Sequence, residues 1–95
     1  MIRVNAILPI QPGIAAEFIV LARRLAEAAK TEPGCISYEV GQDVRNPDLI
    51  VLFEEWTSQD ALTAHMRTPA FQEMTALMAP LHGGDPEFRI CTIVG

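Results

Sequence analysis

Residues 35–56, with the sequence CISYEVGQDVRNPDLIVLFEEW, decide the fold of this chain of 95 residues. Residues 35–40 and 50–56 are predicted to be strands, because each run is bounded by turn-forming residues. Between them lies Asn46-Pro47-Asp48, a tripeptide that favours a turn. The segment therefore predicts an antiparallel β-hairpin with a long loop.

On the N-terminal side of this hairpin we expect a strand and a helix. Residues 2–10 are apolar and rich in β-branched side chains, and Pro12-Gly13 stops the strand that they predict. Residues 13–31 predict a helix that ends at Pro33-Gly34, because apolar residues recur there at intervals of three and four. The residues of that apolar face are Ile14, Phe18, Leu21, Leu25 and Ala28.

On the C-terminal side we expect a helix in two pieces. Thr57 or Ser58 is predicted to cap the first piece, with Asp60 three residues after Thr57, as in a capping box. The helix is interrupted at Thr68-Pro69, since proline suits the first turn of a restarted helix.

A last strand completes the predicted order of elements. Pro80 ends the second helical piece, and residues 88–94 predict the strand. The order β-α-β-β-α-β is typical of an α+β, ferredoxin-like sandwich, in which helices cover one face of a four-stranded antiparallel sheet. We expect one domain over residues 1–95.

The predicted sheet is apolar on both faces, although two helices can cover only one of them. On the uncovered side we expect Ile7, Val51, Phe53, Cys91 and Ile93. Removing these side chains from water gains about 10 kcal/mol, comparable to the stability of a whole small domain, about 5–15 kcal/mol. We therefore predict a homodimer in which two sheets face each other as a dimeric α/β barrel. The alternative is that a loop or the C-terminus folds over this face.

Composition excludes several classes of function. The net charge is −5 and no basic cluster is present, so binding to nucleic acid or to a membrane surface is not expected. The chain has no apolar run long enough to span a bilayer and no signal-peptide pattern, which favours a cytoplasmic protein. Two isolated cysteines and two distant histidines predict neither a disulfide scaffold nor a metal site.

Four side chains are candidates for chemistry, each with a purely structural alternative. Trp56 is either a core residue or a stacking surface with one N–H donor at the edge of a pocket. His65 is either a satisfied helical histidine or a proton acceptor, because imidazole exchanges protons near neutral pH. Tyr38 is expected to pack with its hydroxyl hydrogen-bonded. Glu54 has the strand parity of Trp56, but at a strand end we expect it to be solvated.

The broken helix carries an apolar cluster that is either core or the wall of a pocket. Its members are Met66, Phe71, Met74, Leu77 and Met78. Methionine lines adaptable apolar cavities well, and the break at Thr68-Pro69 leaves a gap between helix and sheet. A small apolar pocket near one histidine and one tryptophan is the default candidate site.

Three segments resemble the antibiotic biosynthesis monooxygenase (ABM) domain family. They are EPGCISYEV at residues 32–40, FEEWTSQDAL at residues 53–62 and HMRTPAF at residues 65–71. The resemblance implies dimeric α/β barrels of ferredoxin-like subunits, in agreement with the sheet argument. It also implies one of several activities, since some members are cofactor-independent oxygenases of phenols or hydroquinones. Other members degrade haem, isomerise small metabolites or have no established activity.

Matched residue by residue, the resemblance favours the small quinol-oxidising branch of the family. Trp56 matches the strand-end tryptophan of the polyketide-oxidising members, but Leu52 and Leu62 stand where those enzymes carry asparagine and tyrosine. Haem degradation is disfavoured, because its asparagine, tryptophan and histidine correspond here to Ala6, His65 and Thr75. His65 itself matches the histidine that is common in the quinol-oxidising branch.

The sequence therefore predicts a cofactor-independent monooxygenase that acts on a small aromatic, phenolic or hydroquinone-like substrate, with no metal. His65 and Trp56 are the predicted catalytic residues, with His65 as base or hydrogen-bond partner. The predicted substrate-binding residues are Tyr38, Leu52, Phe71 and Met78. Two alternatives stay open, namely a non-catalytic, dimeric ligand-binding or stress-associated domain and an isomerase of a small metabolite.

Overall fold

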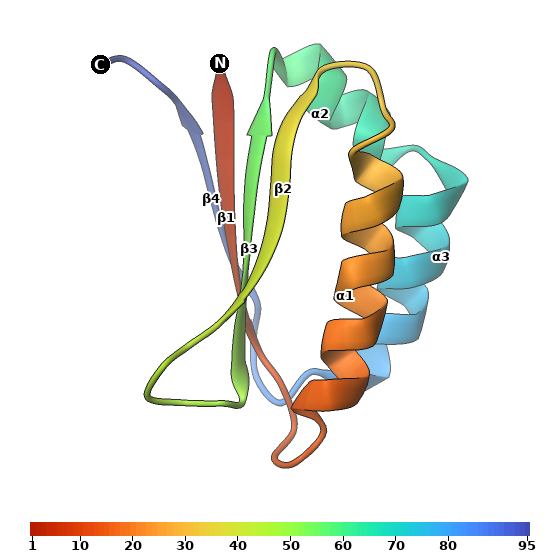
Figure 1. Cartoon of the computed structure of the whole chain (residues 1–95), viewed down its shortest axis with the longest axis vertical. Helices are drawn as coiled ribbons and strands as arrows, with labels where there is room; N and C mark the ends of the chain where they lie inside the picture. Colours follow the sequence, from red (N-terminus) through yellow and green to blue (C-terminus); the bar gives the residue numbers. More distant parts are fainter.

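The computed structural model describes all of residues 1–95 and contains the predicted order of elements, with a sheet in one layer and the helices in another (Figure 1). The second helix is divided, as predicted, and a short 3-10 turn, η1, follows it. The elements are β1 (Ile2–Pro9), α1 (Ala15–Ala29), β2 (Cys35–Gln42), β3 (Leu49–Trp56), α2 (Gln59–Met66), α3 (Pro69–Met78), η1 (Ala79–Leu81) and β4 (Glu87–Thr92).

The four strands form one antiparallel sheet in the order β2-β3-β1-β4. Ala6 of β1 pairs with Leu52 of β3 on one side and with Phe88 of β4 on the other. The α+β, ferredoxin-like fold predicted from the sequence is thus confirmed. None of the helices is long and apolar enough to cross a membrane.

The core lies between the helices and the inner face of the sheet. Alternate residues of β1 and β3 are buried there, beginning with Val4 and Ile50. On α1 the predicted apolar face is displaced by about one residue, since Ile14, Leu21 and Ala28 are only half-buried. The physical reason is the small size of alanine, because Ala22, Ala26 and Ala29 occupy places in the core where larger side chains would need more space. The buried residues of α1 are Phe18, Ala22, Leu25, Ala26 and Ala29.

Side-chain caps start both pieces of the broken helix. The Ser58 hydroxyl accepts a hydrogen bond from the Ala61 N–H (3.1 Å), and the Thr68 hydroxyl accepts one from the Phe71 N–H (3.2 Å). Ser58 is therefore the cap of α2, and the capping box predicted from Thr57 to Asp60 is not formed. Proline stands at the first turn of α3, as predicted.

Gly34 lets the turn between α1 and β2 pack against α2. Its φ is +85°, a conformation that favours glycine, and an added Cβ would lie 2.5 Å from the Cβ of Ala61. This close approach brings the end of α1 and the residues after it next to α2. It places Glu32 beside His65, a contact that belongs to the candidate site.

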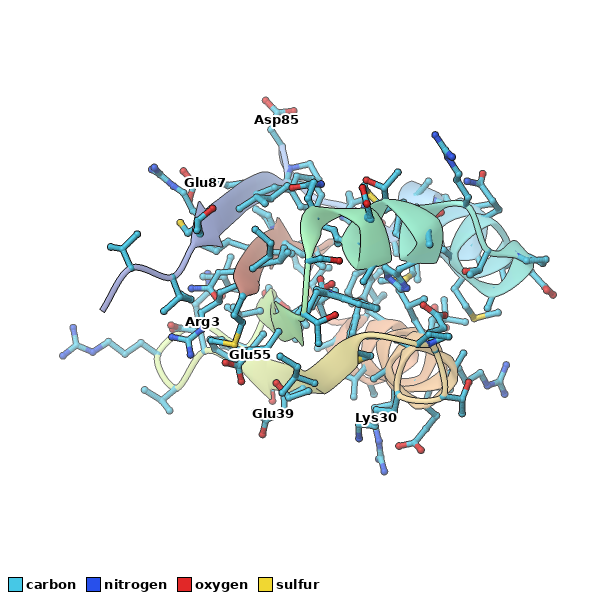
Figure 2. All side chains as sticks on the ribbon, turned by 90° about the horizontal axis from the view of Figure 1, so that it is seen from above. Arg3, Lys30, Glu39, Glu55, Asp85 and Glu87 are labelled. Carbon is cyan, nitrogen blue, oxygen red and sulfur yellow. The ribbon has the colours of Figure 1, made fainter.

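The last strand is shorter and more exposed than the sequence predicts. It ends at Thr92, so Val94 lies outside it and is 95% exposed. Phe88 and Ile90 lie on the helix side of the sheet, paired with Ala6 and Val4, yet both are more than half exposed. The helices cover β2, β3 and β1 but leave the edge strand β4 exposed. The side chains of Asp85 and Glu87, next to β4, project from the edge of the molecule (Figure 2).

The outer face of the sheet is divided into an apolar end and a polar end. At the apolar end Val51 pairs with Ile7, both half-buried, and Phe53 is 44% exposed. The remaining expected members of this face are exposed Cys91 and half-buried Ile93. At the polar end β1 carries Arg3 opposite Glu55 of β3. No helix covers this face, as the sequence predicts, but it is less uniformly apolar than expected.

Candidate functional site

A hollow of about 100 Å³ lies between the inner face of the sheet and α3. Its wall includes all four residues that the sequence predicts for substrate binding, namely Tyr38, Leu52, Phe71 and Met78. Most of its other lining residues are apolar. The gap predicted between the broken helix and the sheet is therefore present in the structure.

A second hollow of about 70 Å³ adjoins the first, and His65 is part of its wall. The two hollows share Glu54, Phe71 and Phe88. Phe88 is 61% exposed on the edge strand, so the shared region lies next to the open side of the molecule. We refer to the two hollows together as the inner cavity.

Glu54 is a candidate residue for which the prediction from sequence is wrong. Only 6% of this residue is exposed, whereas a solvated carboxylate was expected. The physical reason is that the inner face of β3 is covered as far as its last residue, Trp56, which is fully buried, so Glu54 is covered as well. The alternation of strand residues was the signal that pointed to this orientation.

The surroundings of Glu54 bring the pKa of its carboxyl group close to neutral pH. Burial raises the pKa of Glu54 from its ordinary value of 4.5 to about 7. Hydrogen bonds from Trp56 and Tyr38 act in the opposite direction, because they favour the charged form. The indole Nε1–H donates to Oε1 of Glu54 over 3.0 Å. A carboxyl with this pKa can both accept and release a proton near pH 7.

The hydroxyl of Tyr38 stays protonated at neutral pH. It is 2% exposed, and burial followed by the charge of Glu54 raises the pKa of its hydroxyl well above the usual value of 10. It can therefore donate a hydrogen bond within the inner cavity, but it cannot act as a base there.

His65 is held by an acid and three aromatic rings. Its Nδ1 lies 2.7 Å from Oε1 of Glu32, and only 2% of the histidine is exposed. A carboxylate oxygen can only accept, so Nδ1 donates this hydrogen bond, and Nε2 is an acceptor when the ring carries a single proton. The ring centroids of Trp56, Phe71 and Tyr38 lie 4.6, 5.1 and 5.8 Å from that of His65. The arrangement is that of a base whose tautomer is fixed by a third group.

The two predicted catalytic residues therefore occupy different positions. His65 contributes to the wall of the inner cavity, whereas Trp56 is fully buried and lines neither hollow. Trp56 meets the cavity only through its hydrogen bond to Glu54 and its contact with the His65 ring. It offers no open stacking surface.

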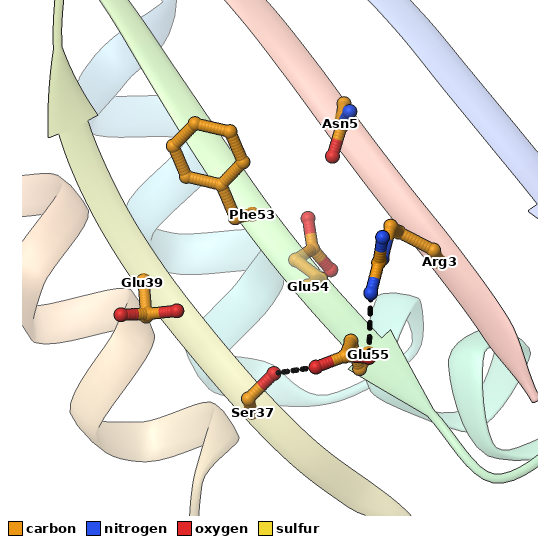
Figure 3. A pocket seen from close by; sticks show the side chains of 7 residues that line it. All are labelled: Arg3, Asn5, Ser37, Glu39, Phe53, Glu54 and Glu55. Carbon is orange, nitrogen blue, oxygen red and sulfur yellow. Dashed lines mark hydrogen bonds and ion pairs between the residues drawn. The ribbon is translucent and has the colours of Figure 1, made fainter.

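A third hollow, of about 320 Å³, lies on the outer face of the sheet at its polar end (Figure 3). Glu55 is part of its wall and accepts hydrogen bonds from Arg3 (3.0 Å) and Ser37 (2.9 Å). The hydrogen bond from Arg3 lowers the pKa of Glu55, so its carboxylate stays charged at neutral pH. Glu54 also borders this hollow, but Phe53 is its only apolar lining residue. The inner cavity, which combines Glu54 with mostly apolar walls, is thus the better candidate site.

No three His, Cys, Asp or Glu side chains in the structure lie close enough together to hold a metal ion. The polar groups of the inner cavity are instead a few separate side chains on apolar walls. Such a cavity suits a small, largely apolar ligand with few polar groups.

Comparisons with known proteins agree with the fold and indicate the family. The family model described as "Antibiotic biosynthesis monooxygenase" matches residues 1–77. A crystal structure described as an antibiotic biosynthesis monooxygenase is 28% identical, covers 100% of both chains and superimposes with a TM-score of 0.93.

Two curated relatives are similar over most of this chain. "Uncharacterized protein sll1783" of Synechocystis is 33% identical over 84 residues, which are 88% of this chain and 57% of that protein. The chain thus spans little more than half the length of this relative. The Bacillus subtilis protein named "Putative monooxygenase YcnE" is 29% identical over 86 residues, which are 85% of this chain and 90% of that protein.

Proposed function

We propose that this chain, which belongs to the antibiotic biosynthesis monooxygenase family, oxidises a small phenolic or hydroquinone-like substrate with molecular oxygen and without a cofactor. The observation that carries the proposal is the buried carboxyl of Glu54, whose pKa is raised to about 7 inside a mostly apolar cavity. A group of this kind is suited to remove the proton of a phenol at neutral pH.

The first step of the proposed reaction is the transfer of a proton. The substrate hydroxyl gives its proton to the carboxylate of Glu54 and becomes a phenolate. His65 is a hydrogen-bond partner or second base for the same oxygen, since its Nδ1 bond to Glu32 leaves Nε2 as an acceptor. Trp56 and Tyr38 position the Glu54 carboxyl through their hydrogen bonds.

The second step passes electrons from the substrate to oxygen. The phenolate gives one electron to O₂, and the two resulting radicals combine by forming a carbon–oxygen bond. The O–O bond then breaks, so that one oxygen atom stays on the ring and the other leaves as water. For a hydroquinone the products are a hydroxyquinone and water, and the substrate supplies all four electrons. The reaction therefore needs no external reductant.

We also propose that the active form is a homodimer. The outer face of the sheet carries exposed Phe53 and half-buried Ile7 and Val51, and no helix covers it. On the same face, Oδ1 of Asn5 is buried without a hydrogen-bond partner, and a second copy is able to supply one. A cytoplasmic location is proposed as well, because both cysteines are free and Cys91 is exposed.

Oxygen uptake with a panel of hydroquinones in metal-free buffer tests the function. The unmodified protein is expected to consume one O₂ per substrate, and His65→Ala to turn over about 10²- to 10⁴-fold more slowly. Circular dichroism and size-exclusion chromatography check that the variant is folded and unchanged in size. An unchanged rate removes His65 from the reaction. Conversion of substrate without oxygen uptake contradicts the oxygenase and favours the isomerase.

A further inference from the structure

The inner cavity is open to solvent along the edge strand β4. Two of its lining residues are exposed, Phe88 (61%) and Ile90 (52%), and both belong to β4. All its other lining residues are buried or half-buried. A ligand that fills the cavity and continues to solvent therefore passes over Phe88 and Ile90.

The register of the sheet places this open side across from Glu54. Val4 of β1 pairs with Glu54 of β3 on one side and with Ile90 of β4 on the other. Ala6, the next inward residue of β1, pairs with Phe88. Neighbouring strands are about 4.8 Å apart, so about 10 Å separate the main chains at Glu54 and Ile90. A path over the buried residues Val4 and Ala6 thus joins the buried carboxyl to the exposed side chains of β4.

The open end of this path is apolar. Phe88 and Ile90 are two residues apart on the same side of β4, and Met66 and Phe71 line the same hollow from the helices. Apart from Glu54, neither hollow has an Asp, Glu, Lys or Arg side chain in its wall. An apolar group that covers Phe88 and Ile90 removes apolar surface from water, whereas a polar group there loses water without gaining a charged partner.

From this placement we infer that the ligand is a phenol or hydroquinone with an apolar substituent, such as an alkyl chain, on the part of the ring away from the hydroxyl that meets Glu54. The substituent lies over Phe88 and Ile90. The inference rests on the proposed function for the contact with Glu54, and it goes further in naming the substituent and the residues that select it. The path lies on the helix side of the sheet, so a second copy on the outer face leaves it open.

Equilibrium binding of alkylphenols without oxygen tests this inference separately from catalysis. Phenol, 4-ethylphenol and 4-butylphenol are titrated into the unmodified protein by calorimetry. Each added CH₂ is expected to tighten binding by about two- to fourfold, where fourfold corresponds to complete burial of the group. The isomer 2-butylphenol is equally apolar, but its chain is next to the hydroxyl and does not reach β4. We expect it to bind about tenfold more weakly than 4-butylphenol.

Two matched variants locate the contact. Ile90→Ser removes an apolar side chain from the path, whereas Leu77→Ser removes one that is similarly exposed (49%) and lines neither hollow. The ratio of the dissociation constants for phenol and 4-butylphenol is expected to fall several-fold in Ile90→Ser and to stay unchanged in Leu77→Ser. Circular dichroism checks that both variants are folded.

One measurement on the unmodified protein needs no variant. The methyl resonances of Ile90 are expected to shift more with 4-butylphenol than with phenol or 2-butylphenol. Equal shifts with the three compounds overturn the contact between the substituent and Ile90, even if Ile90→Ser fails to fold.

The outcomes separate this inference from the proposed function. Equal affinities for 4-butylphenol and 2-butylphenol overturn the inference, and so does an unchanged ratio in folded Ile90→Ser; a second copy that covers β4 produces the same results. A protein that consumes oxygen with hydroquinone but binds the two butylphenols equally supports the oxygenase and contradicts the inference. A protein that prefers 4-butylphenol but consumes no oxygen supports the inference and contradicts the oxygenase.

Discussion

Replacing Glu54 by glutamine is expected to change how the stability of the protein depends on pH. The folded state raises the pKa of Glu54 from 4.5 to about 7, so it binds a proton more tightly than the unfolded chain does. Stability from this group is fully present below pH 4.5, and it is lost as the pH rises towards 7 and beyond. Glu54→Gln removes the titrating group and keeps an oxygen that can accept the hydrogen bond of Trp56.

The size of the effect follows from the pKa difference. One pKa unit corresponds to about 1.4 kcal/mol, so the rise from 4.5 to about 7 lowers the free energy of unfolding by about 3 kcal/mol once the group is ionised. Between pH 5 and pH 8 the loss amounts to about 2.5 kcal/mol per chain. Groups that titrate in both proteins cancel in the difference between them.

Urea unfolding at pH 5, 6, 7 and 8 measures this difference. Protein concentration is held constant, because an oligomer makes apparent stability depend on concentration. The unmodified protein should lose about 2.5 kcal/mol more than Glu54→Gln over this range. Glu55→Gln is the matched control, since Arg3 lowers the pKa of Glu55 and that carboxyl titrates below this range. Parallel pH profiles for the unmodified protein and Glu54→Gln would refute a buried, titrating Glu54.

Three further substitutions test the cap of α3, the support of Glu54 and the outer face. Trp56→Phe removes a hydrogen bond that lowers the pKa of Glu54, so the midpoint of the pH–rate profile for kcat should move to higher pH. An unmoved midpoint contradicts the role of Trp56 in positioning Glu54. Thr68→Ala removes the cap of α3, and urea unfolding should show a free energy of unfolding that is lower by about 1 kcal/mol. An unchanged free energy of unfolding contradicts the role of this cap. Phe53→Lys places a charge on the outer face, where Phe53 is 44% exposed. Sedimentation should then show a 10.4 kDa monomer in place of a dimer. A dimer that persists argues against association through this face.

Most of the fold followed from sequence because its signals are local. Apolar periodicity and the prolines at positions 12, 33, 69 and 80 mark the ends of the strands and helices. The displaced face of α1 could not be predicted in this way. Which alanines of the helix are buried depends on where the sheet lies, and the pattern of apolar residues within the helix does not give that position. The exposure of Phe88 depends on how far the helices reach across the sheet, which is a tertiary property.

The candidate site was predictable in part for the same reason. One hollow is lined by all four predicted substrate-binding residues, Tyr38, Leu52, Phe71 and Met78. Two of them are strand residues that alternate toward the inner face, and the other two belong to the helix over the sheet. The contact of His65 with Glu32 joins α2 to the turn before β2, and no sequence spacing predicts it. The burial of Glu54 does not follow from sequence, because the depth of burial at a strand end depends on what covers it.

Isotope labelling tests the proposed oxygenase most directly. The protein is incubated with hydroquinone under ¹⁸O₂, and the product is analysed by mass spectrometry beside a parallel reaction with Glu54→Gln. We predict one ¹⁸O atom in the hydroxyquinone and one in water, with a large loss of rate in the variant. A product that contains no ¹⁸O, or formation of labelled product at the same rate by Glu54→Gln, would contradict the proposal.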